Sequence, residues 1–370
     1  MADPSLFSET VLQFLGPVRD YLEDDGVTEV MINGPGEIYI ERKGQLIRTD
    51  RSFSGPDSLM AAIRNVGQFV GRGIDRDHPY MDARLPDGSR VHAIIPPCAR
   101  RGPYMAIRRF SRHMLGIDDL VSRGSLTSPV AEFLKACVIA RKNIVVSGGT
   151  GSGKTTLLNI ISAFIPAEER ILVIEDSSEL QLRQSHVLPL ESKKPDRQGQ
   201  GEVTIRDLVT CSLRLRPDRI VIGECRGGEA LDMLQAMNTG HAGSMTTCHA
   251  NGPKDALSRL ETMSLMSGID LPLTAVRGQV ASAIEVVVQI NRFPDGSRRL
   301  IEVAEVLGLD SSGNYQVVSL FAFDLQGKDA QTGQVRGQLR PTGQRPSFSR
   351  ELELTGVDLP ANIFTPPRRG

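Results

Sequence analysis

The sequence predicts an α/β fold in two domains, a small α+β domain followed by a larger domain built on a parallel sheet. Three observations predict it. The chain has 370 residues, more than a single hydrophobic core usually serves. Short strand and hairpin patterns fill the first 110 residues. From residue 143 onward, aliphatic strands alternate with helical segments, which is the pattern of βαβ units.

The N-terminal α+β domain is predicted to cover residues 1–110. Apolar residues recur there at helical spacing, and Gly, Pro and Asn mark turns between short β-branched runs. The pattern predicts, in order, a helix over 11–22, a strand at 28–32, a turn at 33–36, a strand at 37–41, a helix over 59–70, a hairpin turn at Asp87-Gly88, and strands at 91–95 and 105–110.

A linker is predicted over 111–126, and the second domain over 127–330, starting with a helix after Ser128-Pro129. The segment 191–203 has almost no apolar residues, which predicts a mobile loop. Residues 331–370 are rich in Gly, Gln, Arg and Pro and are expected to form an extended or loosely packed C-terminal extension. Candidate strands of the second domain lie at 143–147, 170–175, 219–223, 243–247 and 284–290.

Composition favours a cytosolic protein with free thiols. The five cysteines form no C-x-x-C pair, so we expect no disulfide framework and no structural zinc. The N-terminus lacks the basic and apolar regions of a signal peptide, and the run 280–290 is too short to span a bilayer. The formal net charge of −1 creates no basic field, so no nucleic-acid partner is expected.

A glycine-rich loop between an aliphatic strand and a helix carries the clearest chemistry. It fits the phosphate-binding pattern G-x-x-x-x-G-K-[ST], in which backbone N–H groups surround a phosphate chain. Lys154 is expected to reach the β- and γ-phosphates, and the Thr155 hydroxyl to bind Mg²⁺. The candidate nucleotide-binding residues are Gly148, Gly149, Thr150, Gly151, Ser152, Gly153, Lys154, Thr155 and Thr156.

Two acidic clusters follow predicted strands, at the sheet edge where ligands bind in open α/β sheets. After the strand at 170–175, Glu175 or Glu179 is a candidate to orient water against a γ-phosphate; the alternative is a helix cap or solvated acids. Glu224 ends the strand at 219–223 and is a candidate to hold Mg²⁺ through water. A purely structural pair with Arg226 is the alternative there.

The segment 239–251 combines small residues, hydroxyls and two histidines after another strand. We expect His249, more than His241, to sense a γ-phosphate by hydrogen bonding, although a structural histidine is the alternative. No arginine is evident beside the loop, so arginines from elsewhere, including another chain, are expected to complete the site. The candidates are Arg84, Arg90, Arg108, Arg109, Arg214, Arg216 and Arg226. For each of them, a surface salt bridge is the alternative.

These motifs, in this order, resemble the type II/type IV secretion ATPase superfamily. Residues 148–155 resemble its Walker A motif, 175–179 its aspartate box, 219–224 its Walker B motif, and 243–251 its histidine box. Segments 27–35, 90–97, 107–110 and 215–220 resemble the tight-adherence (Tad) pilus branch. The zinc-binding tetracysteine of some members is absent, and the N-terminal helical region is short for a Tad ATPase.

The resemblance implies a PAS-like N-terminal domain and a RecA-like P-loop ATPase domain in a homo-hexamer, with nucleotide between domains. It implies Glu179 as the base, beside Lys154, Glu175 and Glu224 as catalytic residues, with N-terminal arginines completing the site. ATP and Mg²⁺ are the expected cofactors. The implied protein is a cytoplasmic ATP hydrolase, held peripherally at the inner membrane by a pilus or secretion platform protein, that drives pilin assembly or retraction.

Two other functions remain open at this point. The first is a RecA-like nucleic-acid translocase, which the net charge of −1, the lack of Trp and the five Tyr disfavour. The second is a nucleotide-gated scaffold with little hydrolysis, which the full set of Lys154, Glu179 and Glu224 disfavours. A GTPase is disfavoured because no N-K-x-D segment occurs, and an ABC-type transporter because no L-S-G-G-Q-like signature occurs.

Overall fold

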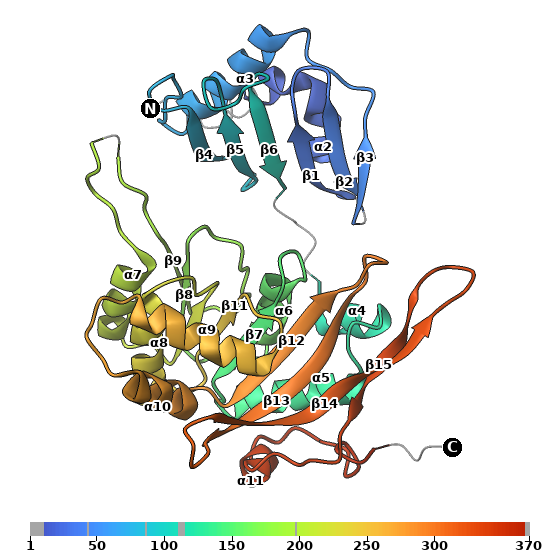
Figure 1. Ribbon diagram of the computed structural model, residues 1–370, viewed down its shortest axis with the longest axis vertical. Helices are drawn as coiled ribbons and strands as arrows, with labels where there is room; N and C mark the ends of the chain where they lie inside the picture. The colour runs from blue at the N-terminus through green and yellow to red at the C-terminus, as the bar shows by residue number, and fades with distance from the viewer. Residues whose placement is uncertain (1–10, 43, 86, 110–114, 197, 367–370) are drawn as a thin grey trace. The chain divides into compact units, whose positions relative to one another are not determined.

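The computed structural model describes residues 11–42, 44–85, 87–109, 115–196 and 198–366. The chain divides into two compact units, residues 1–114 and residues 115–370. Figure 1 shows an antiparallel sheet with helices in the first unit and a larger sheet covered by helices in the second. An α/β architecture with a small α+β unit was predicted from the sequence, and it is confirmed.

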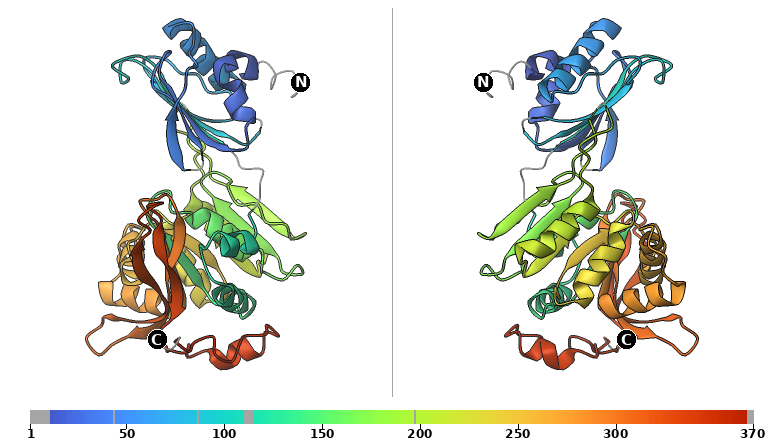
Figure 2. Two further views of the ribbon diagram at one scale, coloured as in Figure 1. Left: turned by 90° about the vertical axis from the view of Figure 1, so that its right-hand side faces the viewer. Right: turned by 90° about the vertical axis from the view of Figure 1, so that its left-hand side faces the viewer.

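The first unit is a six-stranded antiparallel sheet with its helices packed on one face, as a PAS-like domain requires (Figure 2). Alternate strand residues point to that face and form the core with α3, while the other face is open. The strand order is β3-β2-β1-β6-β5-β4. The elements are η1 (Gly16–Val18), α2 (Arg19–Glu23), β1 (Val27–Ile32), β2 (Ile38–Arg42), β3 (Gln45–Arg48), α3 (Pro56–Phe69), β4 (Tyr80–Arg84), β5 (Arg90–Ile94) and β6 (Tyr104–Arg108).

Two sequence predictions for this unit need correction. The helix predicted over 11–22 is interrupted, because Pro17 cannot donate a helical hydrogen bond and Gly16–Val18 form a 3-10 helix before α2. Strand β3 was not predicted, because all four of its residues are exposed and carry no apolar alternation. Phe110, the last residue of the predicted strand 105–110, lies outside the described residues.

The second unit contains a nine-stranded sheet in the order β15-β14-β13-β12-β7-β11-β10-β8-β9. The six strands from β12 to β9 are parallel, and β13, β14 and β15 extend the sheet antiparallel. The strands are β7 (Ile144–Gly148), β8 (Ile171–Glu175), β9 (Val187–Glu191), β10 (Arg219–Ile222), β11 (Met245–Cys248), β12 (Val286–Arg292), β13 (Arg298–Leu309), β14 (Tyr315–Lys328) and β15 (Val335–Pro341).

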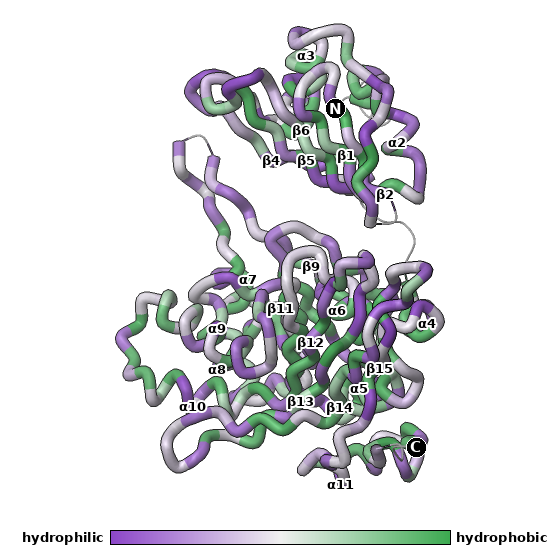
Figure 3. The backbone as a smooth tube through the Cα atoms, turned by 45° about the vertical axis from the view of Figure 1, so that its right-hand side comes forward, coloured by the Kyte–Doolittle hydropathy of each residue, from purple (hydrophilic) through white to green (hydrophobic). Residues whose placement is uncertain are grey.

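Helices cover both faces of the central parallel strands β7, β8, β10 and β11, and these strands are buried along their length (Figure 3). In β7, Ile144 and Val146 belong to one core, while Val145 belongs to the other. The first core includes α5 and α6, and the second includes α8, α9 and α10. The helices are α4 (Ile117–Ser122), α5 (Ser128–Ile139), α6 (Lys154–Ser162), α7 (Ile205–Ser212), η2 (Leu213–Leu215), α8 (Glu229–Asn238), α9 (Pro253–Leu265), α10 (Leu273–Ala283) and α11 (Ser349–Glu353).

All five strands predicted for the second domain exist, each with bounds within two residues of those expected. Strand β9 was missed because Pro189 interrupts its apolar pattern. The prediction of a loosely packed extension over 331–370 is wrong. Strand β15 pairs with β14, and Phe348, Leu352 and Phe364 are buried in the core beside α5. Phe133 packs against Phe321 in a tilted arrangement and against Phe364 edge-on, with ring centroids 5.4 and 5.6 Å away.

The predicted linker is partly wrong as well. Residues 117–122 form α4, whose Leu120 is buried in the core of the second unit. Residues 111–114 of the predicted linker lie outside the described residues. The predicted loop 191–203 is mostly exposed, and a backbone bridge between Lys193 and Val203 closes it. Its mobility stays a prediction.

A buried arginine holds the amino ends of two central strands together. Arg219, at the start of β10, is fully buried and pairs with Glu169 at 2.5 Å. Its other nitrogens donate to the backbone oxygens of Val138 and Gly243. Gly243 has φ +81°, and a Cβ there would collide with the Arg219 guanidinium. Only glycine therefore fits at the entry to β11, whose far end carries His249.

Candidate functional site

The glycine-rich loop joins β7 to α6, as the sequence predicted. Gly151 has φ +68° and Gly153 has φ +97°, a conformation that favours glycine. A Cβ on Gly148 would collide with the backbone oxygen of Ile290 on β12, so glycine is required where the loop leaves the sheet. Thr155 and Thr156 lie in the first turn of α6, where backbone N–H groups and the helix dipole attract anions.

Lys154 is the first residue of α6, at the end of this loop, and it is 7% exposed. Its ammonium donates to the backbone oxygen of Gly149 at 3.0 Å and lies 3.5 Å from Nε2 of His249. A buried ammonium beside a loop of inward N–H groups favours binding of a phosphate chain.

Glu224 and His249 meet at the carboxyl ends of β10 and β11. Nε2 of His249 lies 2.7 Å from Oε1 of Glu224, and Nε and Nη2 of Arg226 approach Oε2, at 2.7 and 2.5 Å. The contact between His249 and Glu224 is closer than the 3.5 Å separation of His249 Nε2 from the Lys154 ammonium, although Oε1 of Glu224 makes no hydrogen bond of good geometry within the described residues. Glu224 is thus shared between a histidine and an arginine.

The pKa of His249 is lowered from 6.5, first by burial and then by the nearby cations Lys154, Arg226 and Arg259, against the opposing charge of Glu224. His249 is therefore neutral near pH 7 and able to act as a directional hydrogen-bonding group.

This shift predicts how stability depends on pH. Because the folded pKa lies below that of the unfolded chain, unfolding takes up a proton and the folded state loses stability as pH falls below about 6.5. The His249→Gln variant lacks this titrating group and therefore this loss of stability. As the pH is lowered from about 7.5 to about 5.5, we expect the melting temperature of the wild type to fall more than that of His249→Gln. A constant difference in melting temperature between the two proteins across this pH range would refute the shift.

The two glutamates of the acidic segment have different surroundings. Glu175 is buried at the end of β8, where its carboxylate accepts the backbone N–H groups of Glu179 and Leu180 at 2.9 and 3.1 Å. Glu175 therefore fixes the loop that carries Glu179, whose own side chain is half-buried. The N–H of Gln181 donates to Asn159 on α6 at 2.7 Å, which ties this loop to the phosphate-binding helix.

Arg226 pairs with Glu224, and the other six predicted arginines lie in three places, with Arg214 in η2 beside Arg216. Arg84, Arg90 and Arg108 are paired neighbours across β4, β5 and β6, so they form one row on the open face of the first unit's sheet. Arg109 is instead an internal anchor whose guanidinium donates to the backbone oxygens of Asp24 and Val27. Arg216 follows η2, with φ +52°, before β10 begins. It lies at the amino edge of the sheet, away from the loop of its own unit.

Three arginines near the loop were missed by sequence reasoning. Nε of Arg298 donates to the backbone oxygen of Gly151 at 2.9 Å. Arg292, on β12, is the strand partner of Arg298. A Cβ on Gly151 would lie 3.5 Å from Nη1 of Arg292. Arg259, on α9, is close enough to lower the pKa of His249. The expectation that no arginine lies beside the loop is therefore wrong. Asp295-Gly296, a turn signal between two β-branched runs, was the available hint.

His241 is placed as a structural residue. Its Nδ1 lies 3.3 Å from the backbone oxygen of Ala236, and its own backbone oxygen accepts from Ser244. It caps the end of α8 near the entry to β11, whereas His249 follows the exit of that strand. The two histidines therefore occupy opposite ends of β11.

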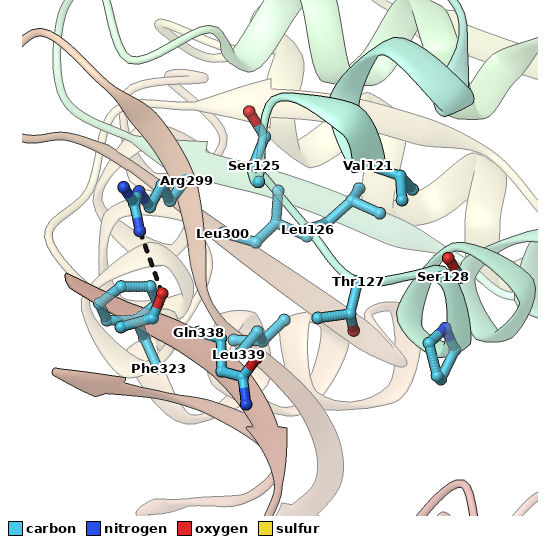
Figure 4. A pocket seen from close by; sticks show the side chains of 13 residues that line it. Val121, Ser125, Leu126, Thr127, Ser128, Arg299, Leu300, Phe323, Gln338 and Leu339 are labelled. Carbon is cyan, nitrogen blue, oxygen red and sulfur yellow. Dashed lines mark hydrogen bonds between the residues drawn. The ribbon is translucent and has the colours of Figure 1, made fainter. Parts of the chain in front are cut away.

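A cavity of about 490 Å³ lies elsewhere in the second unit, between the α4–α5 loop and strands β13 to β15 (Figure 4). Arg299 closes one side by donating to the backbone oxygens of Gly337 and Val335. None of the glycine-rich loop residues lines this cavity, so it is separate from the site above.

Two further properties bear on the site. In the parts of the chain that the structure describes, no three His, Cys, Asp or Glu side chains are grouped to hold a metal ion. Among the same residues, no helix has the length and apolar character needed to cross a membrane.

Comparison with known proteins gives consistent matches along most of the chain. Residues 12–310 match the family model described as type II/IV secretion system protein. The chain is 34% identical to the conjugal transfer protein TrbB of Rhizobium radiobacter, covering 78% of this chain and 86% of TrbB. It is also 34% identical to the type IV secretion system protein PtlH of Bordetella pertussis, covering 78% and 92%. The ATPase DotB of Legionella pneumophila has a similar fold, with 21% identity, a TM-score of 0.55, and 81% and 82% coverage.

Proposed function

The chain belongs to the type II/IV secretion system protein family, and on that basis we propose that it hydrolyses ATP in a homo-hexameric ring. The observation that carries the proposal is the convergence of Lys154, His249 and Glu224 around one phosphate-binding loop. These three groups come from the start of α6 and from the segments that follow β11 and β10, so only the folded sheet brings them together. Their types match what phosphoryl transfer needs, which is charge neutralisation, a γ-phosphate contact and an acid.

Each residue has a distinct task in the proposed reaction. Lys154 leaves the oxygen of Gly149 and binds the β- and γ-phosphate oxygens, while the N–H groups of 151–156 surround the phosphate chain. Glu179 orients the attacking water and accepts its proton. Glu175 holds the Glu179 loop in place through its backbone N–H groups. His249 donates to the γ-phosphate and so distinguishes ATP from ADP.

The residues present fit a magnesium ion bound together with the nucleotide. Oε1 of Glu224 is buried, with His249 as its close neighbour, and Thr155 offers a hydroxyl in the first turn of α6. Oxygen groups of this kind suit Mg²⁺, with Glu224 acting through water. When bound, Mg²⁺ neutralises charge on the β- and γ-phosphates.

We also propose that the arginine row of the first unit completes the site of a neighbouring subunit. Arg84, Arg90 and Arg108 lie in register on one open face, so three guanidinium groups are presented together. Guanidinium groups bind phosphate bidentately, and arginines supplied by another chain accelerate phosphoryl transfer strongly.

A mixing experiment tests this arrangement. Lys154→Ala subunits keep the arginine row, and an Arg84→Ala/Arg108→Ala variant keeps the loop. Each alone should be inactive. Mixed in equal amounts, they should recover a fraction of wild-type phosphate release, because some sites combine an intact loop with an intact row. A mixture of Lys154→Ala with Glu224→Gln subunits is the matched control. It should stay inactive, because each variant has a defect in its own phosphate-binding site that a neighbouring subunit does not supply. Full activity of the arginine variant alone would refute the proposal.

We propose the wider role from the family and from the sequence segments that resemble the Tad branch. The ring would work in the cytoplasm at an inner-membrane pilus or secretion platform, where nucleotide-driven domain motion drives pilin assembly or retraction. Relatives named for conjugal transfer and type IV secretion support a role at such machinery.

A further inference from the structure

One buried amide stands out in the sheet of the second unit. Gln289 is fully buried on β12, within an otherwise aliphatic run that contains Val286, Val287, Val288 and Ile290. Burying an amide is costly unless it is fully hydrogen-bonded, so the partners of Gln289 explain what it does there.

Each end of the Gln289 amide contacts a different part of the candidate site. Its Oε1 accepts from the hydroxyl of Ser147, the residue directly before the glycine-rich loop. Its Nε2 donates to the backbone oxygen of Ala250 at 3.1 Å and to Oδ1 of Asn291 at 3.2 Å. Because a backbone oxygen only accepts, the orientation of the amide is fixed by Ala250.

The register of the sheet explains why this contact occurs. Ser147 is the paired neighbour of Gln289 on one side and of Cys248 on the other, so all three side chains share one face. Ile290 lies next to Gly148, so close that a Cβ on Gly148 would collide with it. The start of the loop therefore has little freedom to move independently of Gln289.

We propose that Gln289 is a positioning residue that transmits the state of the phosphate-binding loop to His249. The inference rests on the proposed ATPase function. The path runs from Gly148 and Ser147 through the Gln289 amide to the backbone of Ala250, which follows His249 directly. A shift of the loop on nucleotide binding moves the Gln289 amide and, with it, the segment that carries the histidine. Buried polar networks of this kind hold discrete arrangements because each partner is costly to leave unpaired.

The test replaces Gln289 with Met, which has similar length but cannot make these hydrogen bonds. Hydrogen exchange is measured at 148–156 and at 249–252, with and without ADP or a non-hydrolysable ATP analogue. In the wild type, we expect nucleotide to change exchange in both segments. In Gln289→Met, the change at 148–156 should persist and the change at 249–252 should be lost. The kcat for ATP should fall about tenfold while KM stays within about threefold.

Two matched variants separate positioning from packing. Val287→Ala removes packing from the same face of the same strand, two residues from Gln289, and leaves the hydrogen bonds of the amide in place, so it tests general weakening of β12. Ser147→Ala removes only the contact toward the loop and should uncouple the two segments while leaving Ala250 paired. If Gln289→Met cannot be purified in a folded form, Ser147→Ala alone tests whether the two segments are coupled through Gln289. A coupled response retained in Ser147→Ala and in any folded Gln289→Met would overturn the proposal.

Failure of the proposed function gives a different result. If the wild type shows no nucleotide-dependent change at 148–156, then nucleotide binding itself is wrong. Gln289 is then tested without nucleotide. Exchange at 249–252 should be faster in Gln289→Met than in a Val287→Ala variant of equal melting temperature. Equal rates in the two variants would overturn the positioning role.

Discussion

Lys154→Ala is expected to lose ATP hydrolysis by at least about a hundredfold and to bind ATP at least about tenfold more weakly. The ammonium donates to the backbone oxygen of Gly149 and lies 3.5 Å from Nε2 of His249, beside the glycine-rich loop. Charge-assisted hydrogen bonds to phosphate are among the strongest that a side chain makes.

The measurement is phosphate release together with nucleotide affinity and melting temperature. Lys135→Ala is the matched control, because Lys135 is an exposed lysine on α5 paired with Glu132. That variant should keep wild-type activity. Wild-type turnover in a folded Lys154→Ala protein would end the assignment of the loop.

Glu179→Gln and Glu224→Gln are expected to separate nucleotide binding from chemistry. Each should keep ATP affinity within about tenfold, since neither carboxylate is a phosphate ligand. Each should lower kcat by about a hundredfold or more, because Gln cannot accept a proton or carry the negative charge. For Glu224→Gln, the pairing with His249 and Arg226 weakens as well.

Single-turnover phosphate release and equilibrium ATP binding measure the two effects separately. Glu132→Gln, an exposed change on α5, is the control and should be silent. Glu175→Gln should also lower activity, because it weakens the support of the Glu179 loop. If Glu179→Gln stays active while Glu175→Gln is inactive, the water-orienting acid is Glu175.

The central strands could be predicted because burial on both faces leaves continuous aliphatic runs, as in 171–174 and 220–222. The outer strands could not. In β14, the residues from Asp324 to Lys328 are largely exposed, and the pairing shifts register near Gly327. Such strands are stabilised by their neighbours and not by their own pattern.

The residues of the site also divide into those that a local sequence pattern predicts and those that it does not. Glu175 ends β8, Glu224 and His249 closely follow β10 and β11, and Lys154 follows the loop after β7, so their meeting at one sheet edge could be inferred. Arg298 and Gln289 reach the loop through pairings more than 130 residues apart in the sequence, which no local pattern encodes. The fully buried Arg219 was read as part of a strand motif, whereas it ties Glu169 to the entry of β11.

The most direct test of the account is steady-state phosphate release from ATP by the purified full chain, measured against Mg²⁺ and protein concentration. Our account predicts turnover that requires Mg²⁺, rises per subunit as the ring assembles, and disappears in Lys154→Ala. Absence of turnover at every Mg²⁺ and protein concentration, in a folded protein that still binds ATP, would contradict it. Equal turnover by the wild type and Lys154→Ala would contradict it as well.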